Sequence, residues 1–351
     1  MTVLKRHRRR REGFGLGFAV ALLMLTAGAG LAAQTPAPST AKKSAPATAT
    51  TANKAATTEI DAAPMPMNKP EKGQELFASP RRAAKALEDA LKEDRKTELL
   101  KILGPGSKDV LWSGDAAEDR SSMERFVKKY DEMHRLQTEP DGYTRLYVGA
   151  ENWPYPIPLA RAGLTWFFDT TAGREEILAR RVGRNELTII DVCGEMVEAQ
   201  KEYFSKVHEG EPKGAYAQRI LSRAGKEDGL YWPASGDAES PLGPFIAKAE
   251  AEGYTADATQ KPEPFHGYFF RVLHSQGANA PGGAKDYVRG GRMTGGFGIL
   301  AYPAEYRSSG VMTFMVGADG VVYQKDLGAK TAELVQSIRA YNPDASWQRA
   351  D

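Results

Sequence analysis

A low-complexity segment over residues 34–71 decides how much of this chain can fold. Ala, Thr, Pro and Ser dominate the segment, and it contains no aromatic residue. A composition of this kind cannot bury enough apolar surface to offset the conformational entropy of the chain. We therefore predict a disordered tether over residues 34–71 and a folded part confined to residues 72–351.

An export signal precedes the tether. Residues 5–11 contain six basic side chains, and residues 14–33 are apolar, uncharged and rich in Gly and Ala. This order is typical of a signal peptide, which we place at residues 1–33 with cleavage near Ala32 or Ala33. The alternative is an uncleaved anchor, since about 20 apolar residues can span a bilayer. We expect the mature protein in the periplasm or outside the cell, and the Sec and twin-arginine routes both stay open.

The charge balance limits the partners of the exported protein. The chain has 47 basic and 45 acidic residues, a net charge of +2. Removal of residues 1–33 takes away six basic residues and one acidic residue, which leaves 41 against 44 and a net charge of −3. Nucleic-acid-binding surfaces are strongly basic, so nucleic acid is excluded as a partner. We also expect no stable membrane span after cleavage.

The sequence predicts neither a cofactor nor a metal. Its single cysteine, Cys193, excludes an internal disulfide and a Cys-based metal cluster, and its apolar helical surroundings predict a buried structural thiol. His266 and His274 are predicted on one face of a single strand, about 26 Å apart at 3.3 Å per residue, which is too far to share a metal. The Gly-rich residues 282–296 lack a phosphate-binding pattern and are predicted to form turns.

The first folded region, residues 72–180, has helical patterns followed by strand patterns. Ser79-Pro80 is typical of a helix start, and a later helix is predicted over about 117–135. Alternating residues then predict strands at 143–148 and 164–169. Helices before an antiparallel meander indicate an α+β fold that resembles the cone-shaped nuclear-transport-factor-2-like fold. In such a cone the candidate bases are His134, Asp141 and Asp169. A structural role explains each of them better: His134 at a helix end, Asp141 in a turn, and Asp169 as the cap of the next helix.

The second region, residues 181–351, combines one long helix with strands. The helix is predicted over 172–207, with a possible break near Gly183, and its apolar face is wide enough to include Leu187 as well as Ile189. Strands follow at 266–274 and 297–302, then a hairpin whose strands, 311–316 and 321–324, are joined by the turn Gly317–Gly320. A last helix is predicted over about 330–340. The region is therefore a long helix packed on an antiparallel sheet.

Four segments carry a resemblance to a known family. They are Asn-Trp-Pro-Tyr-Pro-Ile-Pro at 152–158, Arg-Asn-Glu-Leu at 184–187, Asp-Gly-Leu-Tyr-Trp-Pro at 228–233, and the hairpin at 310–314 and 320–328. On these segments the chain resembles the bacterial domain-of-unknown-function 2950 family over about residues 75–345. The resemblance implies an exported protein, and it transfers no activity and no catalytic residue.

The second region also resembles the globular part of type IV pilins and pseudopilins. The segments that carry this likeness are Ala199–Phe204, Gly267–Arg271 and the hairpin around Asp319-Gly320. The chain departs from pilins at residues 174–184, which are charged where a pilin has an apolar, polymerising half-helix. The resemblance therefore implies a pilin-like module rather than a pilus subunit.

Aromatic residues in predicted loops are the candidate binding residues. Trp153 and Tyr155 lie in one loop, Tyr231 and Trp232 in another, and His134 is added as a residue of the possible cone. Loop aromatics either fill a core or form a recognition surface. We predict an exported, non-enzymatic binding or structural module of the cell envelope, with an envelope protein or a carbohydrate as partner. One alternative is a small-molecule-binding or hydrolytic enzyme with a pocket in the first region, and another is an accessory component of pilus or secretion machinery.

Overall fold

The computed structural model describes residues 68–208, 212–233, 239–256 and 262–350. The predicted signal peptide, and the predicted tether up to residue 67, lie outside these ranges. The end of the predicted tether already contacts the folded part: Asn68 Nδ2 donates to Asp169 Oδ1 (3.0 Å), and the amide of Gly106 donates to Glu71 Oε2 (2.7 Å). The described residues belong to one compact unit of the predicted α+β class, and the two-domain division at residue 180 stays a prediction.

Four helices open the fold. They are α1 (Pro80–Lys92), α2 (Lys96–Leu103), α3 (Lys108–Leu111) and α4 (Ala116–Glu132). The predicted start of α1 is confirmed, because Pro80 is its first residue and Ser79 Oγ accepts from the amide of Arg82 (3.3 Å). This bond satisfies one of the amides that a helix leaves without an internal partner. The helices bury Leu87, Leu99 and Ile102 in a shared core.

An antiparallel sheet packs on these helices. Its strands are β1 (His134–Thr138), β2 (Thr144–Val148), β3 (Trp153–Pro154), β4 (Leu159–Ala162) and β5 (Thr165–Phe168), in the order β1-β2-β4-β5 with β3 beside β2. Leu159 and Phe168 are fully buried in the same core as the helices. The predicted order of helices followed by a meander is confirmed. His134 is the first residue of β1 and is exposed, rather than lying at the end of a helix.

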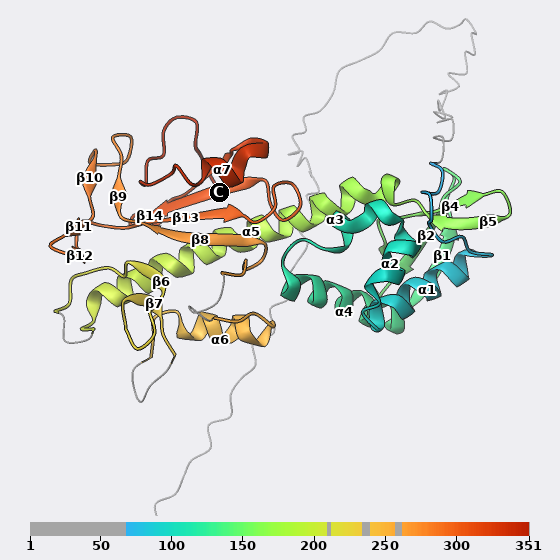
Figure 1. The fold of residues 1–351 in the computed structure, drawn as a ribbon, viewed down its shortest axis with the longest axis horizontal. Coiled ribbons are helices and arrows are strands. Elements are labelled where there is room, and N and C mark those ends of the chain that lie inside the picture. Colours follow the sequence, from blue (N-terminus) through green and yellow to red (C-terminus); the bar gives the residue numbers. More distant parts are fainter. Residues whose placement is uncertain (1–67, 209–211, 234–238, 257–261, 351) are drawn as a thin grey trace, which may run out of the picture. The chain divides into compact units, whose positions relative to one another are not determined.

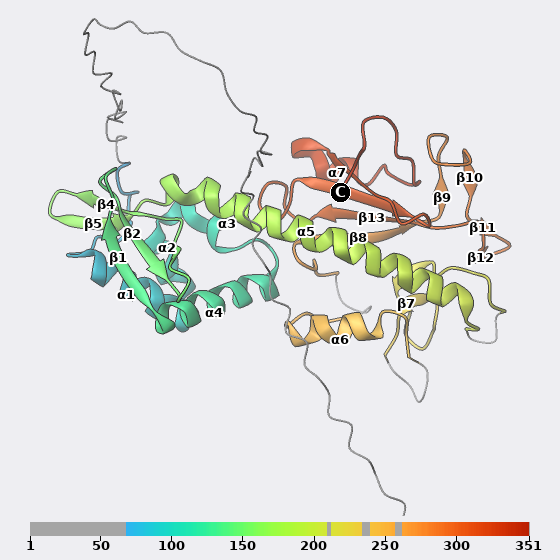
Figure 2. The ribbon, with the colours of Figure 1, turned by 180° about the vertical axis from the view of Figure 1, so that it is seen from behind.

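One helix, α5 (Thr170–Ser205), connects the two sheets (Figures 1 and 2). The predicted break near Gly183 is wrong, because α5 is continuous through this glycine and is bonded to the rest of the fold on both sides of it. Arg181 donates to the carbonyl oxygens of Asp109 (2.8 Å) and Val110, and Asn185 Nδ2 donates to Ser309 O (2.9 Å). Ile189 and Cys193 are buried as predicted, whereas Leu187 is 68% exposed, so the buried face is narrower than the sequence suggests.

The second sheet is antiparallel and lies on α5. Its strands, in the order β16-β15-β14-β13-β8, are β16 (Gln348–Arg349), β15 (Val322–Asp326), β14 (Met312–Gly317), β13 (Gly298–Pro303) and β8 (Tyr268–Leu273). The predicted hairpin is confirmed, with Val316 opposite Val322 and Gly320 at φ +75° in the turn. Tyr268, Phe297 and Phe314 join Met196 of α5 in the core.

Shorter elements surround this sheet. β6 (Arg219–Leu221) and β7 (Gly229–Tyr231) form a parallel pair, and α6 (Gly243–Ala251) follows them. The Gly-rich segment forms turns, as predicted: β9 (Ser275–Gln276) pairs with β10 (Lys285–Asp286), and β11 (Val288–Arg289) pairs with β12 (Arg292–Met293). Gly290 and Gly291 connect β11 to β12 at φ +56° and +78°, a conformation that favours glycine.

Two predicted elements differ in the structure. The last helix is a short 3₁₀ turn (Gly328–Lys330) followed by α7 (Thr331–Leu334), and not a helix over 330–340. Arg271 Nη2 donates to the carbonyl oxygens of Val335 (2.5 Å) and Ile338 (2.8 Å), so side-chain bonds replace the helical ones. His266 does not share a strand with His274, because it lies in the turn before β8 at φ +45°.

Candidate functional site

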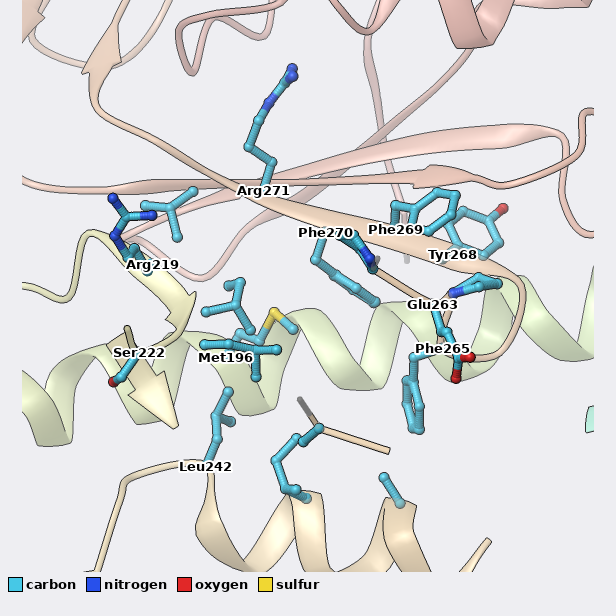
Figure 3. Close-up of a pocket in the computed structure, with 18 of the residues that line it drawn as sticks. Met196, Arg219, Ser222, Leu242, Glu263, Phe265, Tyr268, Phe269, Phe270 and Arg271 are labelled. Carbon is cyan, nitrogen blue, oxygen red and sulfur yellow. The ribbon is translucent and has the colours of Figure 1, made fainter. Parts of the chain in front are cut away.

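A cavity of about 930 Å³ lies beside β8, the outer strand of the second sheet. The parts of the chain that enclose it include the middle of α5, the strand β6, the helix α6 and the residues 262–265 before β8. Figure 3 shows Met196 from α5, Leu242 from the start of α6, and Phe265 and Phe270 around the space between these elements. We call this cavity the β8 groove.

Apolar side chains line most of the β8 groove. Phe245, Phe265 and Phe270 are only half buried by the described residues, and they pack on the core formed by α5 and the second sheet. The rings of Phe245 and Phe265 are in edge contact, with 5.2 Å between their centroids. The ring centroids of Tyr254 and Phe265 are 4.7 Å apart. A cavity of several hundred Å³ with aromatic walls and few polar groups is typical of ligand sites.

Charged side chains lie at the two ends of the β8 groove. Arg219 and Glu263 are at opposite ends in Figure 3. Arg219 is 53% exposed and lies 3.5 Å from the carboxylate of Asp228, and His274 at the same end has its Nε2 3.0 Å from Gln218 O. At the other end the Glu263 carboxylate accepts from Thr255 Oγ1 (3.4 Å). The groove therefore has a basic end and an acidic end.

A second, polar cavity of about 230 Å³ lies on the other side of the connection between α6 and β8. Its ionisable side chains come from α4, α5 and that connection. We call the following residues the Glu118 cluster: Asp115, Glu118, Arg125, Arg184, Glu252, Tyr254 and His266.

Glu118 is the centre of this cluster. Its side chain is only 8% exposed, and its carboxylate lies 2.8 Å from Arg125 Nη2 and 3.1 Å from Arg184 Nη2. Its other oxygen lies 3.6 Å from Nδ1 of His266. Burial alone raises the pKa of Glu118, but His266, Arg184 and Arg125 together outweigh burial and lower the pKa to about 2. Glu118 is therefore a buried carboxylate held in its charged form.

His266 joins two carboxylates across the cluster. Its Nδ1 faces Glu118, and its Nε2 lies 3.2 Å from Glu252 Oε2. A positive φ is uncommon for a residue with a Cβ and costs free energy unless the surroundings hold it. The two flanking carboxylates, together with the bond from its own amide to Tyr254 Oη (3.2 Å), hold His266 in this turn.

Asp115 ties the cluster to the main chain. It is 2% exposed, and its carboxylate accepts from three donors: the amide of Glu118 (3.0 Å), the amide of Gly267 (2.8 Å) and Tyr254 Oη (3.0 Å). The pKa of Asp115 is raised, because burial outweighs these hydrogen bonds. Burial and the charge of Asp115 also raise the pKa of Tyr254.

The β8 groove and the Glu118 cluster share one wall. Tyr254 lines both cavities, and Phe265 of the groove is followed directly by His266 of the cluster. The bonds from Gly267 and Tyr254 to Asp115 therefore fix the chain that carries Phe265 against the start of α4.

Residues 74–350 match a protein family described as a protein of unknown function, DUF2950. The chain belongs to the DUF2950 family. The resemblance read from the sequence is thus confirmed over nearly all of the folded part. No curated protein and no solved structure matches the chain, so its likeness to pilins and to the cone-shaped fold stays a prediction.

The structure of this DUF2950 protein does not bring the five predicted binding residues together. Trp153 is 37% exposed and stacks under Arg180, whose Cζ lies 4.9 Å from the ring. Tyr155 is half buried and packs edge-on against Phe126. These two residues do not line the β8 groove or the Glu118 cluster.

The other three predicted residues also lie elsewhere. Trp232 is 6% exposed and packs in a small core, and Tyr231 belongs to β7 and packs beside it. His134 stacks on Tyr130 at 3.9 Å, with its Nδ1 2.9 Å from Tyr130 O. A binding role for any of the five stays a prediction. Asp169, a candidate base of the cone, caps α5 by accepting from the amide of Ala172 (3.1 Å).

The amino-acid sequence does not reveal the Glu118 cluster, although it contains one local signal. Asp115 and Glu118 have the spacing of a capping box, and Asp115 does cap α4. The side chain of Glu118 does not return to the cap, however, but points to Arg184 and His266, which are distant in the sequence. Nothing in the sequence around Glu118 indicates that it pairs with these distant residues.

Among the described residues, no group of three or more His, Cys, Asp or Glu side chains has an arrangement that could hold a metal ion. None of the helices in these ranges is both long and apolar enough to cross a membrane. Cys193 is fully buried, and burial raises the pKa of its thiol to about 12.

Proposed function

We propose that this DUF2950 protein is an exported, non-enzymatic binding protein of the cell envelope, with the β8 groove as the site for an apolar ligand. The observation that carries the proposal is the groove, about 930 Å³ in volume with half-buried Phe side chains on its walls. Apolar surface left in a cavity of this size gains free energy when a ligand removes it from water. The basic and apolar segments before residue 34 support export.

The Glu118 cluster favours a structural role over catalysis. General acid–base catalysis needs a group that can reach a substrate proton. Both ring nitrogens of His266 already face carboxylates, and Glu118 is already paired with Arg125 and Arg184. These contacts use the cluster's charges inside the fold, which supports binding rather than hydrolysis as the activity of the protein.

A fluorescent apolar dye, anilinonaphthalene sulfonate, tests the groove. Phe245→Ser and Phe270→Ser each remove an aromatic wall, and we expect each to weaken dye binding at least tenfold, since a buried Phe side chain contributes about 1.5–3 kcal/mol and about 1.4 kcal/mol is tenfold in affinity. Leu187→Ser is the matched control, because Leu187 is exposed on α5 outside the groove. Full binding by both groove variants, with loss in Trp153→Ala, would move the site to the predicted loop aromatics.

Cell fractionation tests export independently. Replacement of the basic side chains in residues 5–11 by Ser removes the charged part of the signal, so we expect the protein to stay in the cytoplasm. Unchanged delivery to the envelope fraction would contradict the export part of the proposal.

A further inference from the structure

The strand β8 faces the β8 groove with main-chain groups that no other strand pairs, and β6 lies close to it as another wall of the groove. On its inner side β8 pairs with β13, and Tyr268 lies opposite Pro303, which has no amide hydrogen to donate. Tyr268 instead exchanges two main-chain bonds with Phe265 on the outer side (3.0 and 2.9 Å). Because successive residues of an antiparallel strand alternate between its two sides, Phe270 and Val272 also direct their N–H and C=O groups outward.

The outward N–H and C=O groups of Phe270 and Val272 have no hydrogen-bond partner among the described residues. At each end of this edge, in contrast, other main-chain groups already bond to β8 or to the residue after it. Tyr268 pairs with Phe265 at one end, and the carbonyl oxygen of His274 accepts from the amide of Tyr287 (2.9 Å) at the other. Between these ends, Phe270 and Val272 both line the groove. Two residues of β8, Phe270 and Val272, therefore have unpaired main-chain groups on this edge. Together they offer two N–H donors and two C=O acceptors.

We infer that the occupant of the β8 groove is an extended peptide segment of a partner protein, which adds to the second sheet as a strand beside β8. This inference rests on the proposed function, because it names the ligand class of the same groove. A small apolar molecule fills the cavity but leaves the four main-chain groups unpaired, whereas an added strand satisfies them. Exposed edges of this kind are the usual sites of strand addition.

The geometry of β8 also predicts which residues of the peptide are apolar. In an antiparallel arrangement, the peptide residue opposite Val272 comes first and the residue opposite Phe270 comes two positions later. Both residues exchange main-chain bonds with β8 and direct their side chains to the face of β8 that carries Val272 and packs on α5, so both are apolar.

The charged ends of the groove give the order of charges in an antiparallel peptide. β8 runs from the end near Glu263 to the end near Arg219 and His274. An antiparallel peptide runs the opposite way, so an acidic residue at its N-terminal end lies near Arg219 and a basic residue at its C-terminal end lies near Glu263. The first four residues of the peptide lie opposite Leu273 to Phe270, and the last two turn away from β8, because Phe265 occupies the edge at Tyr268. We infer the pattern acidic, apolar, polar, apolar, polar, basic.

The experiment measures binding of fluorescein-labelled peptides to the full chain by anisotropy. The peptides have Glu first, Lys last, Thr at the polar positions, and Val, Ile or Phe at the two apolar positions. Each is also made with N-methyl groups on the two apolar residues, which removes the amides that face β8, or on the two Thr residues, which alters the amides that face away. We expect the first methylation to weaken binding at least tenfold and the second to change it less than about threefold.

Variants of β8 complete the test. Val272→Pro removes the outward amide without breaking a bond to β13, because proline is tolerated where the amide of an edge strand faces outward. Val272→Ala is the control, because it retains the amide. Compared with this control, we expect Val272→Pro to weaken peptide binding about tenfold and to change dye binding less than about threefold.

The outcomes separate the inference from the proposed function. Dye binding with no bound peptide, or equal loss from the two methylation patterns, would overturn strand addition and leave the apolar site standing. If the unsubstituted protein binds neither the dye nor the peptides, the proposed function is overturned as well. Tighter binding of the peptides with Glu and Lys exchanged would overturn the assigned order of charges.

Discussion

Replacement of Glu118 by Gln tests whether the buried carboxylate stabilises the fold. The substitution keeps the size of the side chain and removes the negative charge that faces Arg125, Arg184 and His266. The lowering of the pKa from 4.5 to about 2 corresponds to about 3 kcal/mol at 1.36 kcal/mol per pH unit. The side chain is only 8% exposed, so solvent screening does little to reduce this value.

The pH dependence has a definite sign. The folded-state pKa of Glu118 lies below its ordinary value, so the charged form stabilises the folded protein. The contribution is complete above pH about 4.5 and is lost as the pH falls towards 2. The difference in the free energy of unfolding between the native protein and Glu118→Gln should therefore be about 3 kcal/mol at pH 7 and should shrink steadily below pH 4.5.

Urea unfolding at pH 7, 4.5 and 3 measures this difference. The test compares the two proteins at each pH, because the raised pKa of Asp115 adds a contribution of the opposite sign to the pH dependence of the whole protein. Glu176→Gln is the control: Glu176 pairs with Arg180 on the exposed face of α5, and the loss of such a pair costs less than about 0.5 kcal/mol. A cost below 0.5 kcal/mol for Glu118→Gln, or a cost that does not change with pH, would refute the reasoning.

Other positions give simpler tests of the packing. Arg181→Ala should lower the free energy of unfolding by about 2–4 kcal/mol in urea, because the buried guanidinium donates to two main-chain carbonyl oxygens of α3; an effect below 1 kcal/mol would contradict its bridging role. Gly310→Ala should destabilise by about 1–3 kcal/mol, since its Cβ would lie 2.0 Å from the Tyr268 hydroxyl. Gly183→Ala, which has open space at the Cβ, should instead raise thermal stability by about 0.5–1 kcal/mol if α5 is continuous. Cys193 should react with Ellman's reagent only along the unfolding transition, because burial raises its pKa to about 12, and rapid labelling of the folded protein would show that the helix opens there.

The elements that the sequence predicts correctly are those whose signals are local. Ser79 and Pro80 define the start of α1 through bonds within one turn of helix, and the turn at Asp319-Gly320 needs only the positive φ of one glycine. The long apolar pattern of α5 survives as a buried face around Ile189 and Cys193. Each of these signals acts over a few residues, so the rest of the fold is not needed to interpret it.

The features that the sequence does not reveal depend on distant partners. α7 ends early because Arg271 binds main-chain carbonyl oxygens more than 60 residues away, and nothing near residue 335 indicates this. His266 follows an alternating pattern in the sequence, but its contact with Glu118 holds it outside the strand. The β8 groove combines residues from α5, β6, α6 and β8, so no single segment carries its signature.

The Glu118 cluster also determines how much of β8 is free. Phe265 closes the outer edge of β8 at Tyr268, and Phe265 is held there because the next two residues, His266 and Gly267, are bonded to Tyr254 and Asp115. Without those bonds the chain before β8 would keep only the contact of His266 with Glu118 as a polar anchor on α4, and a released Phe265 would let the free edge begin at Tyr268 instead of Phe270. A longer free edge in an apolar groove favours pairing between copies of the chain. The buried charges of the cluster therefore limit the edge to the length that one short strand can occupy.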